Sequence, residues 1–210
     1  MAIELFGSLF SFILIFAILV YNKSMKELLN IVDNDDKIIG EKTREEIHRE
    51  GLLHREVHVY FITPNKELIL QHRAKDKDTY PDLLDAAVGG HVEIGDSYEQ
   101  TAIKEAAEET GVEISLDNLI FLSKTKRWSE DKATGKINNA IGQSYIYIFT
   151  GELSDLKIEA GKSLGFEIWS SEKLLNISEV DSKKFIPYIL EFSKTELASF
   201  MNNFNNSIYE

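Results

Sequence analysis

The segment Gly89–Val112 reads GGHVEIGDSYEQTAIKEAAEETGV, a glycine pair followed by a charged, alanine-containing pattern. Asp96 or Ser97 can cap a helix, and Ser97 with Gln100 has the spacing of a capping box. In that motif each side chain accepts a hydrogen bond from the other residue's backbone N–H. Gly111 is the residue type that ends helices in a left-handed conformation. The segment therefore predicts a helix between Ser97 and Gly111.

Three glutamates of this predicted helix share one face. Positions three and four apart are neighbours on a helix surface, so Glu105, Glu108 and Glu109 project together and repel one another mildly. A solvated surface tolerates such a cluster, and a hard divalent cation such as Mg²⁺, which prefers oxygen ligands, would neutralise it. Composition alone leaves both interpretations open. Gly89 and Gly90 favour the cation site, because glycine lets the backbone approach a ligand closely.

Composition excludes several classes of function. The chain has 210 residues and a formal net charge of −12, which argues against nucleic-acid binding because such proteins usually carry a basic face. An anionic substrate would need local neutralisation by a cation or by a few placed Lys and Arg side chains. The chain has no cysteine, which excludes disulfides, thiolate metal sites and cysteine nucleophiles.

The amino-terminal region contains an uncharged apolar run, residues 5–20. Its length is close to the lower limit for spanning a bilayer. Lys23 and Lys26 follow it, and the positive-inside rule then predicts that the rest of the chain lies in the cytoplasm. We therefore expect residues 1–24 to form a membrane anchor. The alternative is a buried or misassigned leader before a soluble protein that starts at Met25.

The remaining sequence predicts a layered α+β domain. Residues 43–51 have the pattern of a short capped helix, and the alternation in residues 57–63 and 67–72, on either side of a Pro64-containing turn, predicts a β-hairpin. Further strand-like stretches are residues 83–88, 119–128, 143–151 and 165–170. From Asp181 onward the pattern is helical, with Pro187 as its opening residue or as a kink. Strands before and after one helix are typical of a mixed sheet with helical layers.

The glycine-to-helix segment resembles the Nudix box. The matching positions are Gly90, Asp96, Lys104, Glu105, Glu108, Glu109, Gly111 and Val112. Asp96 stands where the family usually has Glu, and Lys104 where it usually has Arg. The resemblance implies a Nudix-type α/β/α sandwich with a mixed sheet, in which a Mg²⁺ or Mn²⁺ ion promotes hydrolysis of a diphosphate bond.

The same resemblance implies roles for individual residues. Glu105, Glu108 and Glu109 would be metal ligands, with the backbone carbonyl of Gly89 joining them. Glu105 and Glu108 would also be catalytic, together with Lys104, which would hold Glu105 in its ligating orientation. The alternative for Lys104 is an ordinary i,i+4 ion pair with Glu108.

Residues 28–178 also resemble the branch of the family nearest to isopentenyl diphosphate isomerase. His54 and His91 fall where that isomerase has metal-binding histidines. Its catalytic cysteine, however, falls at Gly89, and its essential glutamate falls near Gln143. Alkene isomerisation requires one group that donates a proton and another that removes one, and neither is present at these positions. We therefore favour hydrolysis. His54 and His91 are then interpreted as lining residues, although a neutral imidazole could add to a Mn²⁺ site.

Other charged residues near the motif are candidates for substrate binding. Arg73, Lys75 and Lys77 could hold phosphate groups at the mouth of the site or form a solvated loop. Gly90 and His91 are further candidates. His48, His58 and His72 are interpreted as structural residues, and Trp128, with Glu130 and Asp131, is expected at a hairpin tip where an aromatic ring could stack on a base.

These observations lead to three hypotheses. The first is a cytoplasmic hydrolase that acts on a small-molecule nucleoside diphosphate or its derivative and binds no nucleic acid. The second is a Nudix-like sensor that binds a nucleotide without turnover, and the third is the isomerase. We expect three regions, residues 1–24, a Nudix domain over 25–180, and a carboxy-terminal helix and tail over 181–210.

Overall fold

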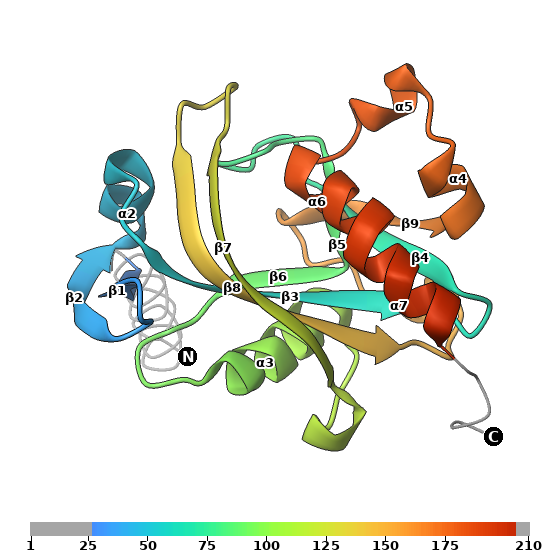
Figure 1. Ribbon diagram of the computed structural model, residues 1–210, viewed down its shortest axis with the longest axis horizontal. Coiled ribbons are helices and arrows are strands. Elements are labelled where there is room, and N and C mark those ends of the chain that lie inside the picture. The colour runs from blue at the N-terminus through green and yellow to red at the C-terminus, as the bar shows by residue number, and fades with distance from the viewer. Residues whose placement is uncertain (1–26, 205–210) are drawn as a thin grey trace, which may run out of the picture.

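The computed structural model describes residues 27–204, which fold around one nine-stranded sheet with helices on both faces (Figure 1). The strands are β1 (Leu28–Val32), β2 (Ile38–Thr43), β3 (His54–Ile62), β4 (Glu67–Arg73), β5 (Leu84–Ala86), β6 (Val88–His91), β7 (Ile120–Glu130), β8 (Ile137–Ile148) and β9 (Ser163–Ser170). The α-helices are α2 (Arg44–Glu50), α3 (Tyr98–Thr110), α4 (Ser171–Leu175), α5 (Glu179–Ser182), α6 (Pro187–Phe192) and α7 (Ala198–Asn203), with a π-helical turn at Ser193–Leu197 between the last two.

Strand β3 is the centre of the sheet. It pairs in parallel with β8 along its whole length and antiparallel with β1, β4 and β6. Strand β4 extends the sheet through antiparallel pairing with β5 and β9. The sheet is therefore mixed, which confirms the α+β expectation.

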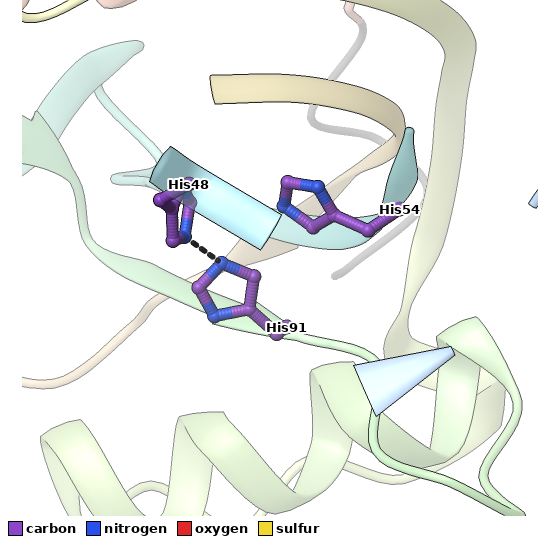
Figure 2. A group of neighbouring side chains, drawn as sticks. All are labelled: His48, His54 and His91. Atoms are coloured by element: carbon purple, nitrogen blue, oxygen red, sulfur yellow. Dashed lines mark hydrogen bonds between the residues drawn. The ribbon is translucent and has the colours of Figure 1, made fainter. Parts of the chain in front are cut away.

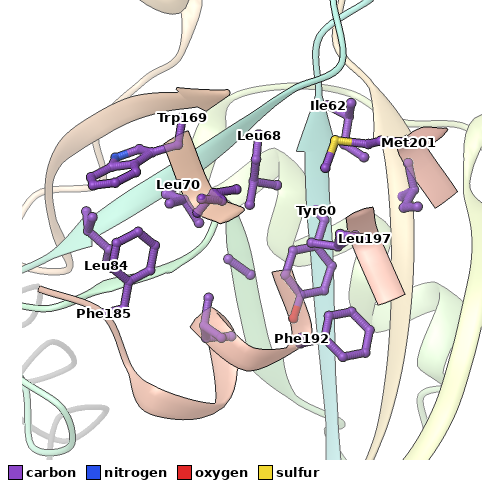
Figure 3. Close-up of a cluster of buried hydrophobic side chains, with 14 of the residues drawn as sticks. Tyr60, Ile62, Leu68, Leu70, Leu84, Trp169, Phe185, Phe192, Leu197 and Met201 are labelled. Atoms are coloured by element: carbon purple, nitrogen blue, oxygen red, sulfur yellow. The ribbon is translucent and has the colours of Figure 1, made fainter. Parts of the chain in front are cut away.

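Alternating side chains of β3 build two separate cores. Val57, Val59 and Phe61 point to one face and pack with α3. Tyr60 and Ile62 point to the other face and pack with α6 and α7 (Figure 3). Successive strand residues face opposite sides of a sheet, so this one strand, most of whose residues are buried, supplies both cores. This arrangement confirms the α/β/α sandwich.

Helix α3 lies close to the sheet because its inner face carries short side chains. Ala102 and Ala106 are fully buried against the sheet. Its ends agree with the sequence prediction, since Ser97 and Gln100 form the capping box and Gly111 ends the helix at φ +71°. The close packing brings Glu105 next to Gly90 and Glu109 next to Gly89 of β6.

Several elements differ from the sequence prediction. The chain changes partner at Ala87, pairing with β4 before it and with β3 after it, so the predicted strand over 83–88 is two strands. Strand β8 begins at Ile137 instead of near residue 143, because pairing with β7 outweighs the low strand propensity of Asn138 and Asn139. Strands β1 and β2 were not predicted. Pro187 opens α6 as its first residue.

The predicted membrane anchor falls in residues 1–26, outside the described residues, and so remains a prediction. Between residues 27 and 204, no helix combines the length and the apolar character that crossing a bilayer requires.

The burial of β3 generates a stability prediction. Phe61 is fully buried between Tyr147 and Phe149, so Phe61→Ala should lower the free energy of unfolding by about 3–5 kcal/mol. Phe121→Ala is the matched control, because Phe121 is 56% exposed and should cost less than about 1 kcal/mol. Denaturant unfolding monitored by circular dichroism measures both, and equal losses would contradict the two-core assignment.

Candidate active site

A cavity of about 840 Å³ lies between β3, β6, helix α3, the loop after β4 and strand β7. One part of its wall carries Gly89, Gly90, Glu105 and Glu109, and another carries the basic side chains Arg44, Arg73, Lys77 and Lys162. A concave site with a few convergent polar groups is the usual form of a small-molecule site.

Glu105 and Glu109 form a destabilised carboxylate pair in this wall. Glu109 is 4% exposed, and its Oε2 accepts hydrogen bonds from the Gly89 backbone N–H at 3.2 Å and from Gln71 Nε2 at 3.4 Å. Burial raises the pKa of Glu109 to about 7. Burial, and secondly the neighbouring Glu109 carboxylate, raise the pKa of Glu105 to about 7 as well. The nearby positive charge of Lys162 offsets only part of this effect, and a divalent cation with a preference for oxygen ligands would stabilise the charged carboxylates further.

Gly90 is the residue that lets Glu105 reach this position. A Cβ atom at residue 90 would lie 2.5 Å from Cδ of Glu105, which is far inside van der Waals contact. At Gly89 the nearest atom would be Cδ2 of His58 at 3.4 Å, an ordinary contact. The second glycine of the pair is therefore a requirement of the carboxylate geometry.

The other two motif residues lie differently from expectation. Glu108 is exposed and does not line the cavity, so its metal and catalytic roles remain predictions. Lys104 contacts neither predicted partner. Its Nζ lies 2.6 Å from Oε2 of Glu93, in an exposed ion pair with the loop before α3. That loop turns back across the first turns of the helix and offers the nearer carboxylate, so Lys104 does not hold Glu105 in place.

The predicted phosphate-binding residues differ in their positions relative to the cavity. Arg73 lines the cavity, but its guanidinium donates to Asp85 Oδ2 at 2.9 Å, Tyr80 O at 3.1 Å and Thr79 O at 2.7 Å. These contacts fix the loop after β4 and occupy most of its donors. Lys75 is exposed and lies outside the lining, whereas Lys77 lines the cavity. Gly90 and His91 line it as expected.

The cavity floor contains a buried ion pair that the sequence interpretation missed. Arg127 of β7 donates to Glu56 of β3 and to the Tyr188 hydroxyl, and its guanidinium lies 4.1 Å from the centroid of the Tyr188 ring. Burial alone would raise the pKa of Glu56, but Arg127 holds it well below the usual range. Glu56 and His58, which flank Val57 on the central strand β3, were the available signal. Gly142 leaves the space that the guanidinium fills.

Trp128 is a residue of β7 and not of the hairpin tip. It is 62% exposed at the lip of the cavity, and the turn itself spans residues 131–136. Asp131 is buried and accepts a hydrogen bond from the Tyr80 backbone N–H at 2.9 Å, so it has a structural role. Trp128 therefore remains a candidate for stacking against a planar group.

His48, His54 and His91 form a cluster at the edge of the cavity (Figure 2). One ring nitrogen from each lies within 4.8 Å of the others. Nδ1 of His48 lies 3.0 Å from the Ile137 carbonyl oxygen, and Nδ1 of His54 lies 3.0 Å from the Leu52 carbonyl oxygen. A carbonyl only accepts, so both Nδ1 atoms carry the proton and both Nε2 atoms present lone pairs.

The histidine cluster has the donor chemistry of a transition-metal site. Burial lowers the pKa of His48 to about 4 and that of His91 well below its ordinary value, so the rings are neutral near pH 7. Nε2 of His54 is buried and has no hydrogen-bond partner, while Nε2 of His48 and Nε2 of His91 are 3.1 Å apart. Neutral imidazoles suit Zn²⁺ and other first-row ions softer than Mn²⁺. The interpretation of His48 as an isolated structural residue was therefore incomplete.

Residues 52–188 match the NUDIX domain family model, which covers well over half of the chain. The chain belongs to the Nudix family. Across 144 residues it is 30% identical to a Nudix hydrolase of Clostridium acetobutylicum, covering 67% of this chain and 68% of that protein. It is also 26% identical over 165 residues to isopentenyl-diphosphate Delta-isomerase 2 of Photorhabdus laumondii, covering 77% of this chain and 78% of that protein.

A solved structure supports the fold independently. The crystal structure of DR0079 from Deinococcus radiodurans superimposes with a TM-score of 0.60 at 23% identity, over 84% of this chain and 98% of that one. Another curated Nudix relative, from Nostoc, is 37% identical over 97 residues, and the match spans 57% of its length. The family model and these relatives together support a Nudix pyrophosphohydrolase.

The glycine geometry of the Nudix loop generates a second prediction. Gly90→Ala should displace the Glu105 carboxylate and weaken Mn²⁺ binding by at least about tenfold, because a ligand is lost from the set. Gly89→Ala meets only an ordinary contact and keeps the backbone carbonyl, so its effect should be much smaller. Mn²⁺ titration followed by electron paramagnetic resonance measures both affinities. Equal affinities in the two variants would show that Glu105 does not depend on Gly90.

The raised pKa values generate a third prediction. Glu105 and Glu109 must lose their protons before they bind a cation, so affinity for Mn²⁺ should rise with pH through about 7 and level off above it. We expect at least about tenfold tighter binding at pH 8 than at pH 6. Titration calorimetry in two buffers of different ionisation enthalpy would also report the protons released. An affinity independent of pH would place the ion elsewhere.

Proposed function

We propose that this Nudix protein hydrolyses a diphosphate bond in a nucleoside diphosphate or a nucleotide derivative, with Mg²⁺ or Mn²⁺ as its cofactor. The observation that supports this most directly is the carboxylate pair of the half-buried Glu105 and the buried Glu109, which lines a cavity and has pKa values raised to about 7. The proposed location is the cytoplasm, on the basis of the positive charges that follow residues 5–20.

The residues of the cavity have two proposed roles, binding the cation and orienting its ligands. Glu105 and Glu109 would hold the cation, with Glu108 and the Gly89 carbonyl as the remaining proposed ligands. A bound divalent ion neutralises charge on phosphate oxygens and activates water. Gly89 N–H and Gln71 orient the Glu109 carboxylate, and Gly90 admits that of Glu105.

The isomerase alternative lacks its proton-transfer groups. The chain has no cysteine, and Gly89 stands in the position of that enzyme's catalytic cysteine. Gln143 carries no carboxylate, and its Oε1 accepts a hydrogen bond from the Tyr145 hydroxyl. Hydrolysis requires only water and the cation-binding carboxylates, all of which this cavity can accommodate.

The test is a turnover screen with a matched pair of variants. Nucleoside diphosphates, triphosphates, dinucleotides and sugar nucleotides are incubated with Mg²⁺ or Mn²⁺, and released phosphate is measured directly and after phosphatase treatment. On the substrate found, Glu105→Gln should lower kcat/KM at least about a hundredfold, as loss of a group that stabilises the transition state does. Glu113→Gln removes one negative charge from an exposed residue and should change it less than twofold.

Three outcomes separate the hypotheses. Turnover that requires Glu105 supports the hydrolase. Measurable nucleotide binding without turnover of any compound would support the sensor instead. Full activity of Glu105→Gln would remove the carboxylate pair from the mechanism.

A further inference from the structure

Lys162 reaches the cavity from a segment remote from the Nudix motif. It follows Gly161 in the turn before β9 and lines the same cavity as Glu105 and Glu109. Its charge acts on both carboxylates, since the positive Lys162 opposes the rise in their pKa values. Nothing in the motif pattern marks this lysine, so its position is information that only the structure supplies.

The backbone around Lys162 is fixed against β4. The Lys162 carbonyl accepts a hydrogen bond from the Ala74 N–H at 3.0 Å. The next residue, Ser163, pairs with Arg73 in the sheet and donates from its hydroxyl to the His72 carbonyl at 3.2 Å. Gly161 adopts φ +79°, the left-handed conformation that glycine accepts readily. The lysine therefore extends from an anchored turn and not from a loose loop.

The ammonium group of Lys162 also forms an ion pair. Its Nζ lies 3.0 Å from Oε2 of Glu159, three residues earlier, with both side chains about one-third exposed. Such a partly exposed pair contributes little to stability. The ion pair does limit the positions that the long side chain of Lys162 samples. An ammonium group has three N–H donors, so the contact with Glu159 leaves donors for a ligand.

Lys77 supplies a second ammonium to the same cavity. It is half-buried near Lys162 and Arg73, and burial, followed by the nearby Arg73, lowers its pKa. No carboxylate within residues 27–204 is in ion-pair contact with its Nζ. Burying a cation without an ion pair costs free energy, and an anionic ligand would offset that cost.

We propose that Lys162 and Lys77 bind the non-bridging oxygens of the substrate's diphosphate beside the Glu105 and Glu109 pair, with Glu159 as the residue that positions Lys162. The physical need is specific to this cavity. Two glutamates that hold a cation still repel phosphate, and in a chain of net charge −12 the compensation must be local. Two ammonium groups provide it and form charge-assisted hydrogen bonds to phosphate oxygens. This inference deepens the proposed function but rests only on a diphosphate being the ligand.

The experiment uses the full chain with inorganic pyrophosphate and Mg²⁺, measured by titration calorimetry. Lys162→Met keeps the aliphatic stem and removes the charge, and it should weaken pyrophosphate binding about tenfold or more. Lys162→Arg should recover most of the affinity. Lys157→Met is the matched control, because Lys157 is an exposed lysine of the same segment outside the cavity lining, and it should stay within twofold of the parent.

Metal affinity measured without pyrophosphate separates ligand binding from a structural role. Removal of a positive charge next to the carboxylates should leave Mn²⁺ affinity of Lys162→Met unchanged or higher while pyrophosphate affinity falls. Weaker binding of both ions, with a lower melting temperature, would show a structural residue and overturn the proposal, as would pyrophosphate affinity within twofold of the parent.

The proposal can fail or succeed apart from the hydrolase. If the turnover screen succeeds and Lys162→Met binds pyrophosphate normally, the inference alone is wrong. If no compound is hydrolysed but Lys162→Met binds pyrophosphate more weakly than the parent, the proposed diphosphate site is supported and the catalytic proposal is wrong. Where a substrate is found, Lys162→Met should raise KM more than it lowers kcat, because the contact forms in the ground state as well as in the transition state.

Discussion

The close approach of helix α3 to strand β6 determines the chemistry of the cavity. Alanines on the inner face of the helix and Gly90 on the strand remove the side chains that would keep the two apart. The approach buries Glu105 and Glu109 next to each other, and their pKa values rise to about 7. Without a cation, the folded protein holds these protons while the unfolded chain has released them. The contribution of this pair to stability therefore falls as pH rises from about 4.5 to about 7. The buried histidines contribute in the opposite direction below about pH 6.5, because burial lowers their pKa values.

The other charges of the cavity wall are largely balanced within the protein. Glu56 pairs with Arg127, Asp85 with Arg73, and Asp78 with Arg44, where two guanidinium nitrogens lie 2.7 and 3.1 Å from the carboxylate oxygens. Breaking the Glu56–Arg127 or Asp85–Arg73 pair, both of which are largely buried, would leave an uncompensated charge and be strongly destabilising, whereas the Asp78–Arg44 pair is about one-third exposed. These pairs therefore build the wall. The carboxylates of Glu105 and Glu109 and the ammonium of Lys77 line the same cavity without any ion-pair contact among the described residues.

Local signals in the sequence were sufficient for the parts of the fold that depend on neighbouring residues. The capping box of α3, the capped helix α2 with Gly51 at φ +64°, and the β3–β4 hairpin agree with the structure. The division of residues 83–88 between two strands depends on which strand each half meets, and no local pattern contains that information. Strand β8 likewise begins among asparagines that only its partner β7 holds extended.

The same distinction applies to the site. The spacing of the glutamates placed Glu105 and Glu109 correctly on one face, but it could not show that Glu108 would be left exposed and that Glu93 would take Lys104. Arg73 illustrates the limit for cations. From sequence it is a basic residue that could hold phosphate or belong to a solvated loop, whereas in the structure its donors hold Asp85 and the carbonyls of residues 79 and 80. Whether a charge is available to a ligand depends on tertiary partners.

The cavity has groups that could bind a cation, but it lacks the two proton-transfer residues of the isomerase. Two sets of possible ligand groups lie there, the carboxylates of α3 and the three imidazoles at the cavity edge. In that cluster Nε2 of His54 has no hydrogen-bond partner, whereas Nε2 of His48 accepts a hydrogen bond from Nε2 of His91. Carboxylates favour Mg²⁺ and Mn²⁺, whereas imidazoles favour softer ions. Gly89 and Gln143, which stand at the positions of the isomerase acid and base, transfer no protons. A cavity that retains ligand groups but lacks those two agents is suited to a reaction in which water is the nucleophile, and this asymmetry favours hydrolysis over isomerisation on the same fold.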